Sequence, residues 1–398
     1  MPGDAPLSGT TVLDFTRVLS GPYCTMLLAD MGARVIKIEQ PGCGDDTRAW
    51  GPPFVDGESA YFLSINRNKE SLTLDLKHPS ARRAVDVLLQ RADVLVENFR
   101  PGTMERLGYG CEAVRKRFPA LVYCSISGFG QTGPRNAEPG YDAVMQGEAG
   151  LMSITGDLHG PPFRLGVAIA DIVSGMFAAQ GIAMALLARM RTGRGQRVDV
   201  GMLDATTALL TYQAGIYFAT GRTPVRMGNR HPSIVPYETF AGSDGDFVIA
   251  VGNDDQWRRF CAVVGAGELA DDRRFATNRD RVANYDALRP LLVERLKSRT
   301  RGAWVEALKS AGVPCGSVRD VAEALQDAQL TARQMIETVE HATAGAVRVL
   351  GVPIKLSETP GGVRTAPPAL GEHTREILRR DCGLSDEEIG ELRSSGAV

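Results

Sequence analysis

The regular alternation of apolar strand patterns with helical patterns constrains the fold of this 398-residue chain more than any other feature. A strand pattern at Val12 to Thr16 precedes a helix opened by Pro22, and a second strand pattern follows at Arg34 to Ile38. Pro is favoured at the first helical position, and Gly32 is a typical stop signal. Further strand patterns are Leu72 to Leu76, Val94 to Glu97 and Leu121 to Ser127. The alternation predicts an α/β fold with an open parallel sheet covered on both faces.

The middle of the chain changes character. Two long helical patterns, roughly Ile172 to Met190 and Met202 to Thr220, flank a short strand pattern at Arg197 to Val200. From Gly221 to Pro236 the chain is rich in Gly, Pro, Arg and Asn without periodicity, which indicates a linker or functional loop. A smaller α+β domain is expected beyond it, because a hairpin pattern and three helical patterns follow: Tyr237 to Phe240, Phe247 to Val251, Gln256 to Val264, Asp286 to Arg299 and Ala303 to Ser310.

Composition excludes several classes of function. The net charge of −2, with 23% charged residues, indicates neither a nucleic-acid-binding surface nor an acidic tail. Seven cysteines, an odd number without a C-x-x-C pair, argue against a disulfide framework or zinc site and favour a cytoplasmic setting. The five histidines lie far apart, so no metal site is expected. No secretory signal pattern opens the sequence, and the apolar stretch Ile172 to Ala188 contains polar residues, which predicts a buried helix rather than a membrane span.

Asp171 is the leading chemical candidate. It stands between the small apolar run Gly166 to Ala170 and a helix rich in Ala and Gly. Asp is a preferred N-cap, so the local pattern predicts a cap. A nucleophile is compatible with that position, because the helix N-terminus stabilises an ionised carboxylate. Two further carboxylates, Asp142 and Glu148, lie in one glycine-bounded segment, where another cap and a solvated charge are expected.

A glycine loop follows the strand pattern at Leu121 to Ser127. Gly128, Gly130 and Gly133 match the G-x-G-x-x-G spacing of dinucleotide sites, but that motif requires a helix to open within the loop. Pro134 and the residues after it break the segment. We therefore expect these glycines to let the backbone approach some other ligand closely.

Seven short runs extend in order over nearly the whole chain and together resemble the class III CoA-transferases, of the formyl-CoA and carnitine CoA-transferase type. Each run is weak alone, whereas their joint occurrence is specific. The runs are Val12 to Thr16 with Gly21-Pro22, Val35 to Glu39, Asn66 to Lys69, Ala92 to Val94 with Glu97 to Phe99, Ser127 to Gly130, Thr192 to Gln196, and Gly371 to Thr374.

This resemblance implies a domain plan and a set of partners. A Rossmann-like large domain would comprise residues 1–220, completed by the C-terminal segment 337–398, with a linker at 221–236 and a small α+β domain at 237–336. The family assembly is an interlocked homodimer. The substrates would be a coenzyme A thioester and a free carboxylic acid, with no prosthetic group, nucleic acid or membrane involved.

Asp171 resembles the family's catalytic aspartate. In the family mechanism this carboxylate attacks the donor thioester to give a mixed anhydride, and the released thiolate then forms an aspartyl-CoA thioester. The acceptor acid repeats both steps in reverse. Backbone N–H groups of the loop Gly128, Phe129 and Gly130 would stabilise the tetrahedral oxyanions.

Five positions resemble residues that line the family's CoA site. Guanidinium groups suit the 3′-phosphate of CoA, and Phe99 offers an apolar face. Taken alone, Arg106 is equally a surface helix residue and Phe99 a core residue. Gln40 and Pro139 depart from basic residues of the formyl-CoA branch. The five positions are Arg17, Leu74, Asn98, Phe99 and Arg106.

Tyr141-Asp142 separates two chemistries within the superfamily. The similar α-methylacyl-CoA racemases carry a His-Asp pair at this point, with His as the base for α-proton transfer. A tyrosine is a much weaker proton acceptor near neutral pH, so transfer is favoured over racemisation or epimerisation. Asp142 is expected to orient the acyl group or Tyr141. A CoA-binding protein without activity is a third hypothesis.

The loop that contains Gly228, Asn229 and His231 indicates the acceptor class. It lacks the glycine quartet of the formyl-CoA branch and resembles the succinyl-CoA-using, dicarboxylate branch. Arg226 or Arg230 would hold a distal carboxylate, and the alternative is that both are loop charges facing solvent.

Overall fold

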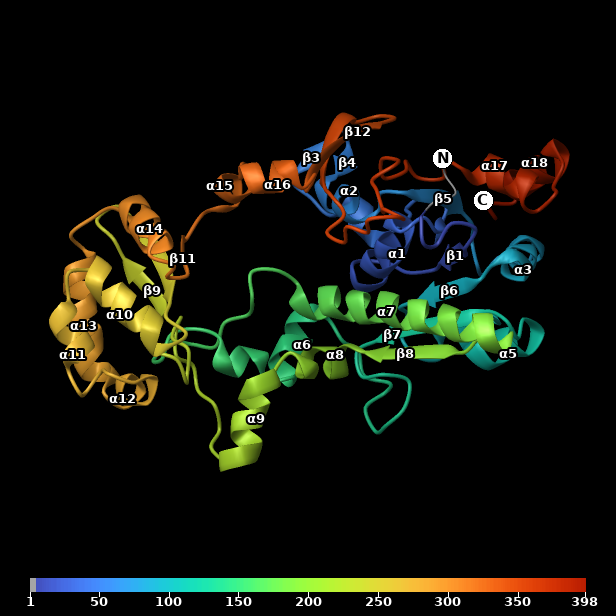
Figure 1. The fold of residues 1–398 in the computed structure, drawn as a ribbon. Coiled ribbons are helices and arrows are strands. Elements are labelled where there is room, and N and C mark those ends of the chain that lie inside the picture. Colours follow the sequence, from blue (N-terminus) through green and yellow to red (C-terminus); the bar gives the residue numbers. More distant parts are fainter. Residues whose placement is uncertain (1–4) are drawn as a thin grey trace. The chain divides into compact units, whose positions relative to one another are not determined.

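The computed structural model describes residues 5–398, which form two compact units (Figure 1). The first unit contains the described chain up to Leu151, Arg164–Ala219 and Ala328–Val398. The second contains Met152–Phe163 and Thr220–Asp327. Three segments therefore group differently from the boundaries expected from the sequence. The expected linker, residues 221–236, belongs to the second unit. Residues 152–163 pack with the second unit, and the chain returns to the first unit at Ala328, before residue 337.

A six-stranded parallel sheet forms the centre of the first unit, as the alternating patterns predict. Its strand order is β5-β2-β1-β6-β7-β8. The strands are β1 Thr11–Asp14, β2 Arg34–Glu39, β5 Lys69–Thr73, β6 Val94–Glu97, β7 Val122–Ser127 and β8 Arg197–Gly201. Only β5 differs clearly from its expected range, Leu72 to Leu76. It begins three residues earlier, at the buried Lys69.

Alternate residues of the strands supply two separate cores. Leu13 and its equivalents pack with helices α3, α17 and α18, whereas Val12 and its equivalents pack with α1 and α7. This is the expected consequence of side chains pointing to opposite faces of a strand. Here the C-terminal segment covers part of the same face as α3. The helices are α1 Ser20–Asp30, α3 Ala81–Arg91, α7 Ile169–Thr192, α17 Thr374–Arg380 and α18 Asp386–Ser394, the last opening with a capping box at Ser385.

The order of connections reverses at β1, since the chain passes from β1 to β2 on one side and reaches β6 on the other. In open parallel sheets, ligands bind outside the carboxyl ends of the strands at such a switch point. The residues that follow β1 and β6 are Arg17 on one side and Asn98 and Phe99 on the other. The topology thus places three predicted site residues at one end of the sheet.

Helix α7 packs closely against α1 because Gly175 has no side chain. A Cβ atom there would lie 2.6 Å from the carbonyl oxygen of Ser20. Helix α7 is also the one described helix with the length and hydropathy of a membrane span. Half of its apolar window is buried, and it packs on α1, β7 and β8 within the first unit. These contacts are those of a core helix.

The second helical pattern, expected as one helix over Met202 to Thr220, forms two helices. Helix α8 spans Met202–Ala208 and α9 spans Thr211–Thr220. Thr211 has a φ of 37°, which a continuous α-helix does not allow. The apolar pattern continues across the break, which is why periodicity alone missed it.

The second unit is the expected small α+β fold. Strands β9 Tyr237–Ala241 and β10 Asp246–Ala250 form the predicted antiparallel hairpin, and β11 Cys315–Ser317 adds to β10. Buried aromatic side chains, among them Trp257, Phe260 and Trp304, fill its core. Its helices are α10 Asp254–Val263, α11 Gly267–Asp271, α12 Asn278–Ala283, α13 Tyr285–Leu296, α14 Arg301–Ser310 and α15 Val321–Leu325.

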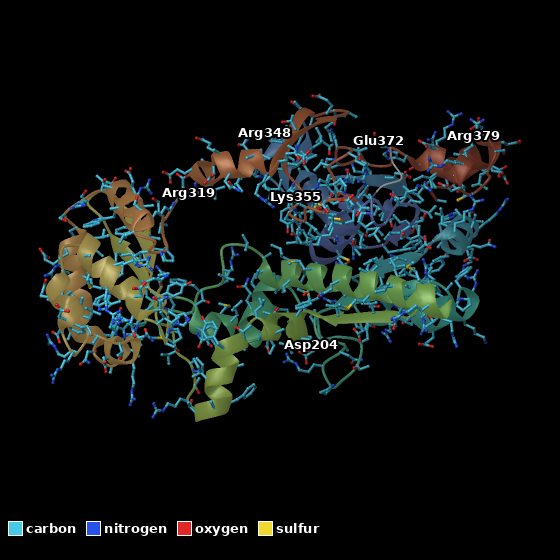
Figure 2. All side chains as sticks on the ribbon, in the orientation of Figure 1. Asp204, Arg319, Arg348, Lys355, Glu372 and Arg379 are labelled. Atoms are coloured by element: carbon cyan, nitrogen blue, oxygen red, sulfur yellow. The ribbon has the colours of Figure 1, made fainter. Side chains whose placement is uncertain are left out.

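Short elements complete the two units. A hairpin of β12 and β13 packs on Leu63 of α2 in the first unit. Charged side chains are spread over both units, as Arg348, Lys355 and Arg319 illustrate (Figure 2). The remaining elements are η1 Asp46–Ala49, β3 Phe54–Val55, β4 Glu58–Ser59, α2 Ala60–Ile65, α4 Thr103–Leu107, α5 Cys111–Arg117, α6 Asp142–Glu148, η2 Leu151–Ile154, α16 Ala328–Ala332, β12 Ile336–His341 and β13 Gly345–Leu350.

We expect Gly175→Ala to destabilise the protein by roughly 1–3 kcal/mol, because its methyl group would push α1 away from α7. Urea unfolding measures the change. Gly215→Ala in α9 is the matched control, since a Cβ there meets nothing within 4 Å. The control should be neutral or stabilising by up to about 1 kcal/mol, as helix propensity dictates. Equal stability of the two variants would show that the close approach of α1 and α7 has no energetic weight.

Candidate active site

A small pocket of about 180 Å³ opens at the switch point of the sheet. It collects predicted residues that are far apart in the sequence, from the ends of β1, β6 and β7 and from the starts of α6 and α7. The predicted site residues that line it are Arg17, Asn98, Phe99, Gly128, Tyr141 and Asp171. The structure thus brings the predicted nucleophile and part of the predicted CoA site into one place.

A larger pocket of about 600 Å³ adjoins the first. The two share Arg17, Asp46 and Phe99 as lining residues. Leu74 and Arg106, the other two predicted CoA-site residues, lie in the larger pocket. Gln40 lines the larger pocket and Pro139 the smaller one.

The loop after β1 is held in place by Asn98. The Arg17 N–H donates to Asn98 Oδ1 over 2.8 Å, and Asn98 Nδ2 donates to the Arg17 carbonyl oxygen over 2.7 Å. The Asn98 amide therefore positions the loop rather than facing the pocket with free groups. The Arg17 guanidinium lies 5.1 Å from the centre of the Phe99 ring and 3.4 Å from an Asp46 carboxylate oxygen.

Val18, the next residue of this loop, has a φ of 68°, a left-handed conformation that a β-branched residue rarely adopts. Its N–H donates to Asp45 Oδ1 over 3.2 Å. Asp45 in turn accepts a hydrogen bond from the ammonium of Lys37, and both side chains are fully buried. Strained backbone of this kind persists where the surroundings enforce it, and it is typical of ligand-binding sites.

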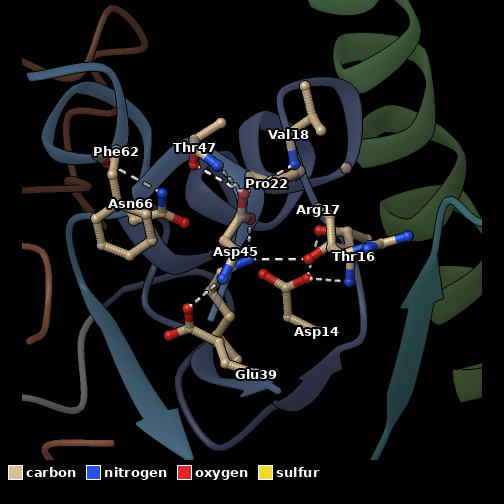
Figure 3. A network of polar contacts seen from close by, with 12 residues as sticks. Asp14, Thr16, Arg17, Val18, Pro22, Glu39, Asp45, Thr47, Phe62 and Asn66 are labelled. Carbon is tan, nitrogen blue, oxygen red and sulfur yellow. Dashed lines mark hydrogen bonds and ion pairs between the residues drawn. The ribbon is translucent and has the colours of Figure 1, made fainter. Parts of the chain in front are cut away.

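Buried charges beneath the loop form a network (Figure 3). Lys37 also donates to the Thr16 carbonyl oxygen over 2.9 Å, and Asp14 accepts from the Thr16 N–H over 2.9 Å. Burial alone would raise the pKa of Asp14, but the ammonium groups of Lys69 and Lys37, together with hydrogen bonds from Thr16 and Thr25, outweigh it and lower that pKa to about 2. Asp14 is therefore ionised, and the loop rests on paired charges. The Glu39 carboxylate accepts hydrogen bonds from the Arg48 guanidinium, the Ser71 hydroxyl and the Asp45 N–H.

Asp171 is not an N-cap, contrary to the local pattern. Helix α7 begins at Ile169, its cap is Ala168 without a side-chain bond, and Asp171 lies in the first turn. Burial raises the pKa of the Asp171 carboxyl to about 7, the charge of Asp142 adds to the increase, and hydrogen bonds from Ser20 oppose it. The expected stabilisation of the anion by the helix end is thus outweighed by burial and by a second carboxylate. Near neutral pH, a carboxyl group with this pKa is protonated in some molecules and ionised in the others.

Asp142 performs the capping that the sequence assigned to Asp171. Its Oδ1 accepts from the Ala170 N–H over 2.8 Å, at the start of α7. Its Oδ2 accepts from Gln146 Nε2 over 2.8 Å, and Gln146 Oε1 accepts from the Leu165 N–H. Both oxygens are engaged, so Asp142 is a positioning residue. It fixes the turn that carries Asp171 and adds negative charge beside it.

Tyr141 precedes α6, and the residue is 67% exposed. Its place beside the pocket depends on a backbone contact, because a Cβ on Gly128 would lie 2.8 Å from the Gly140 Cα. Only glycine fits both sides of this contact. The segment from Gly128 to Tyr141 contains no helix, and the ring of Phe129 packs under the Arg135 guanidinium at 4.1 Å.

Tyr61 of α2 was missed by the sequence analysis. Burial and the nearby charges of Asp171 and Asp142 raise its pKa to about 12, so it is a neutral phenol close to both carboxylates. Its ring packs edge-on against Trp50. No local motif marks Tyr61, because it meets the start of α7 only in the fold, where Tyr61, Ala168 and Ile172 pack against one apolar cluster.

The remaining predicted residues, Gly228, Asn229 and His231, lie in the second unit. Gly228 and Asn229 line a pocket there of about 520 Å³. The His231 ring stacks on Tyr237 with centroids 5.2 Å apart. Among residues 5–398, no three His, Cys, Asp or Glu side chains gather in a way that would hold a metal ion.

Comparisons with known proteins agree with this site. Residues 7–374 match the family model described as CoA-transferase family III. The chain is 41% identical over 393 residues to the succinyl-CoA:glutarate CoA-transferase of Mus musculus, covering 99% of this chain and 90% of that protein. It is 46% identical over 353 residues to the acetyl-CoA:oxalate CoA-transferase of Acetobacter aceti, covering 88% and 89%. A CaiB/BaiF family protein from Brucella suis has a similar structure, with a TM-score of 0.84 and 42% identity over 94% of this chain and 98% of that chain.

The fold, the pocket at the switch point and these matches define an enzyme that transfers CoA. The chain belongs to CoA-transferase family III, and the resemblance noted from its seven sequence runs is confirmed.

Asp142→Asn should move the pH dependence of CoA transfer to lower pH. The predicted nucleophile Asp171 must be ionised to attack, so we expect kcat/KM to rise with pH through about 7 in the wild type. Removing the charge of Asp142 lowers the pKa of Asp171, whereas Asn Oδ1 still accepts from the Ala170 N–H. The pH profile of kcat/KM measures this shift. Glu148→Gln, the same change on the exposed end of α6, should leave the profile where it is. An unmoved inflection in Asp142→Asn would contradict the coupling.

Proposed function

We propose that the protein transfers CoA from succinyl-CoA to a small dicarboxylic acid through a covalent aspartyl-CoA thioester on Asp171. One observation carries the proposal. The Asp171 carboxyl, with a pKa raised to about 7, lines a small pocket that adjoins a larger one at the switch point of the sheet. A partly desolvated carboxylate that ionises near neutral pH is a stronger nucleophile than a solvated one.

The two pockets suit the two ends of an acyl-CoA. The larger pocket, with Arg106, Lys77 and Arg17 among its lining residues, would take the phosphorylated nucleotide. The thioester would then enter the smaller pocket past Arg17 and Phe99, which line both. Gln40 in the larger pocket carries no charge, so the contacts to the phosphates of CoA would be made by Arg17, Lys77 and Arg106.

The chemistry needs no external acid or base. An ionised Asp171 oxygen bonds to the donor carbonyl carbon, and collapse of the tetrahedral adduct expels CoA thiolate and leaves a mixed anhydride. The thiolate attacks the aspartyl carbonyl carbon and expels succinate, which gives the aspartyl-CoA thioester. The acceptor carboxylate then expels thiolate to form a second anhydride. Attack of the thiolate on the acceptor carbonyl carbon releases the new acyl-CoA and the Asp171 carboxylate. One carboxylate enters and one leaves, so charge balances.

Nearby groups would assist without reacting. Ser20 donates to Asp171 and opposes the rise of its pKa, which favours the ionised form. Tyr61, a neutral phenol that experiences the charges of both carboxylates, is one candidate hydrogen-bond donor for a tetrahedral oxyanion. The loop Gly128 to Gly130 is a second candidate for that role, since Gly128 lines the pocket.

The dicarboxylate preference rests on the relatives. One is named for succinyl-CoA and glutarate and another for acetyl-CoA and oxalate, so both are named for a small dicarboxylic acid. Racemisation is the alternative. It needs a base for the α-proton, and the exposed Tyr141 at that position is a poor one near neutral pH.

Incubation with succinyl-CoA alone should add CoA to the wild-type protein, as intact mass spectrometry would detect. Asp171→Ala should abolish the adduct and lower kcat by at least about a thousandfold, because it removes a nucleophile. Glu148→Gln serves as the control that should retain the adduct. A wild-type enzyme that turns over without any adduct would falsify covalent transfer.

The racemase alternative has its own test. A chiral 2-methylacyl-CoA incubated with the enzyme in heavy water should show no α-deuterium incorporation. Incorporation that survives in Asp171→Ala would favour proton transfer over CoA transfer.

We propose in addition that the chain forms the homodimer of its family. A row of apolar side chains on α7 is exposed in the single chain, namely Met176, Phe177, Met184, Leu187 and Met190, the last 83% exposed. Their spacing puts them along one side of the helix. Large exposed apolar surfaces of this kind are typical of interfaces.

Sedimentation equilibrium should give twice the chain mass. Met184→Asp with Leu187→Asp should shift the protein towards monomer, because both charges would be buried on association. A monomeric wild-type protein at micromolar concentration would contradict the dimer.

A further inference from the structure

The pocket in the second unit has a composition that the CoA site does not explain. It encloses about 520 Å³ between the segment 157–158, the loop 225–230, strand β9 and helix α13. Two arginines and an amide line it, Arg230, Arg289 and Asn229. All of these elements belong to the second unit, so the pocket is complete within that unit.

Arg230 is the arginine of this pocket that forms no ion pair among the described residues. Its guanidinium lies flat over the Tyr285 ring, 3.4 Å from the ring centre. Among the described residues it has no ion-pair partner, and its Nε is buried without a hydrogen-bond acceptor. A buried unpaired donor costs free energy, and one on a planar guanidinium is suited to a carboxylate.

The groups beneath Arg230 keep it in this orientation and leave its charge free. Glu238 is buried and accepts hydrogen bonds from Arg289 Nε over 2.8 Å and from the Tyr285 hydroxyl over 3.1 Å. Burial, with Glu238 close by, raises the pKa of Tyr285 to about 12, so the phenol is neutral. The Glu238 charge is thus balanced by Arg289, and Arg230 rests on a neutral ring.

The neighbouring Arg226 is different. Its Nε donates to the Asp157 carbonyl oxygen over 3.2 Å and its Nη2 to the Gly160 carbonyl oxygen over 2.9 Å. Arg226 ties two loops of the unit together. Of the two arginines that the sequence offered as carboxylate ligands, only Arg230 has its donors available.

Two acidic side chains also line the pocket. Asp157 and Asp286 are exposed to solvent, which weakens their field inside the pocket.

We propose that this pocket binds a carboxylate of a small dicarboxylic acid, with the Arg230 guanidinium as the principal ligand and Asn229 and Arg289 beside it. The identity of the acid rests on the proposed function, whereas the site itself rests on the unpaired guanidinium. Binding would supply acceptors for the donors that Arg230 leaves unused in this structure.

Glutarate binding to the Asp171→Ala protein tests the site without covalent chemistry. Ligand-observed NMR titration should detect glutarate and should detect no binding of pentane-1,5-diol, which has the same chain length without charge. Arg230→Met should weaken glutarate binding by about tenfold or more, because a charge-assisted bidentate contact is lost. The glutarate affinity of Arg230→Lys should lie between that of the parent protein and that of Arg230→Met, since the charge remains and the planar guanidinium is lost.

The matched control is Arg258→Met, which removes an exposed arginine of α10 in the same unit. It should bind glutarate as the parent protein does, and thermal unfolding should show both methionine variants folded. Glutarate binding that is unchanged in Arg230→Met would overturn the site. So would a protein that forms the CoA adduct on Asp171 but does not bind glutarate, a result that leaves the covalent mechanism standing. If the wild-type protein forms no CoA adduct but binds glutarate in a way that depends on Arg230, the covalent mechanism is wrong and the Arg230 site stands.

Discussion

The buried ammonium of Lys37 is the constraint on which the site depends. This ammonium donates to the Thr16 carbonyl oxygen and to the Asp45 carboxylate. Asp45 in turn accepts from the N–H of Val18, whose backbone is left-handed. A charge without exposure must be paired, because an isolated one would cost several kcal/mol. The pairing therefore fixes the Arg17 loop at the carboxyl end of β1, and that loop separates the two adjoining pockets.

The ionisation of Asp171, the proposed nucleophile, is set by two opposing influences. Helix α7 begins close to Ser20 because Gly175 lets α1 approach, and Ser20 favours the ionised form of Asp171. Burial and Asp142 favour the protonated form and prevail. Asp142 also caps α7, because its Oδ1 accepts from the Ala170 N–H. Asp142 thus contributes both to the position and to the ionisation of the proposed nucleophile.

Much of the fold was predictable, because strand and helix periodicity is local. Strand β6 spans the expected Val94–Glu97, and the small-unit hairpin has the expected pairing. The seven sequence runs identified the family, yet several of their residues, including Lys37, Glu39 and Lys69, belong to the buried charge network rather than to the chemistry. Roles that depend on long-range contacts were not predictable. Asp142 caps a helix 28 residues away, and Tyr61 approaches Asp171 from an early helix.

The raised pKa of Asp171 has a thermodynamic consequence for the whole chain. The usual pKa of an aspartate is 3.8, and the folded value is about 7. Between these two values the native state binds more protons than the unfolded chain, so linkage makes the free energy of unfolding fall as pH rises through that interval. Above pH 7 the unliganded fold carries this penalty in full. The ionised form that the proposed chemistry needs therefore lowers the stability of the unliganded fold in alkali, and formation of an aspartyl thioester, which removes the charge, would relieve the penalty.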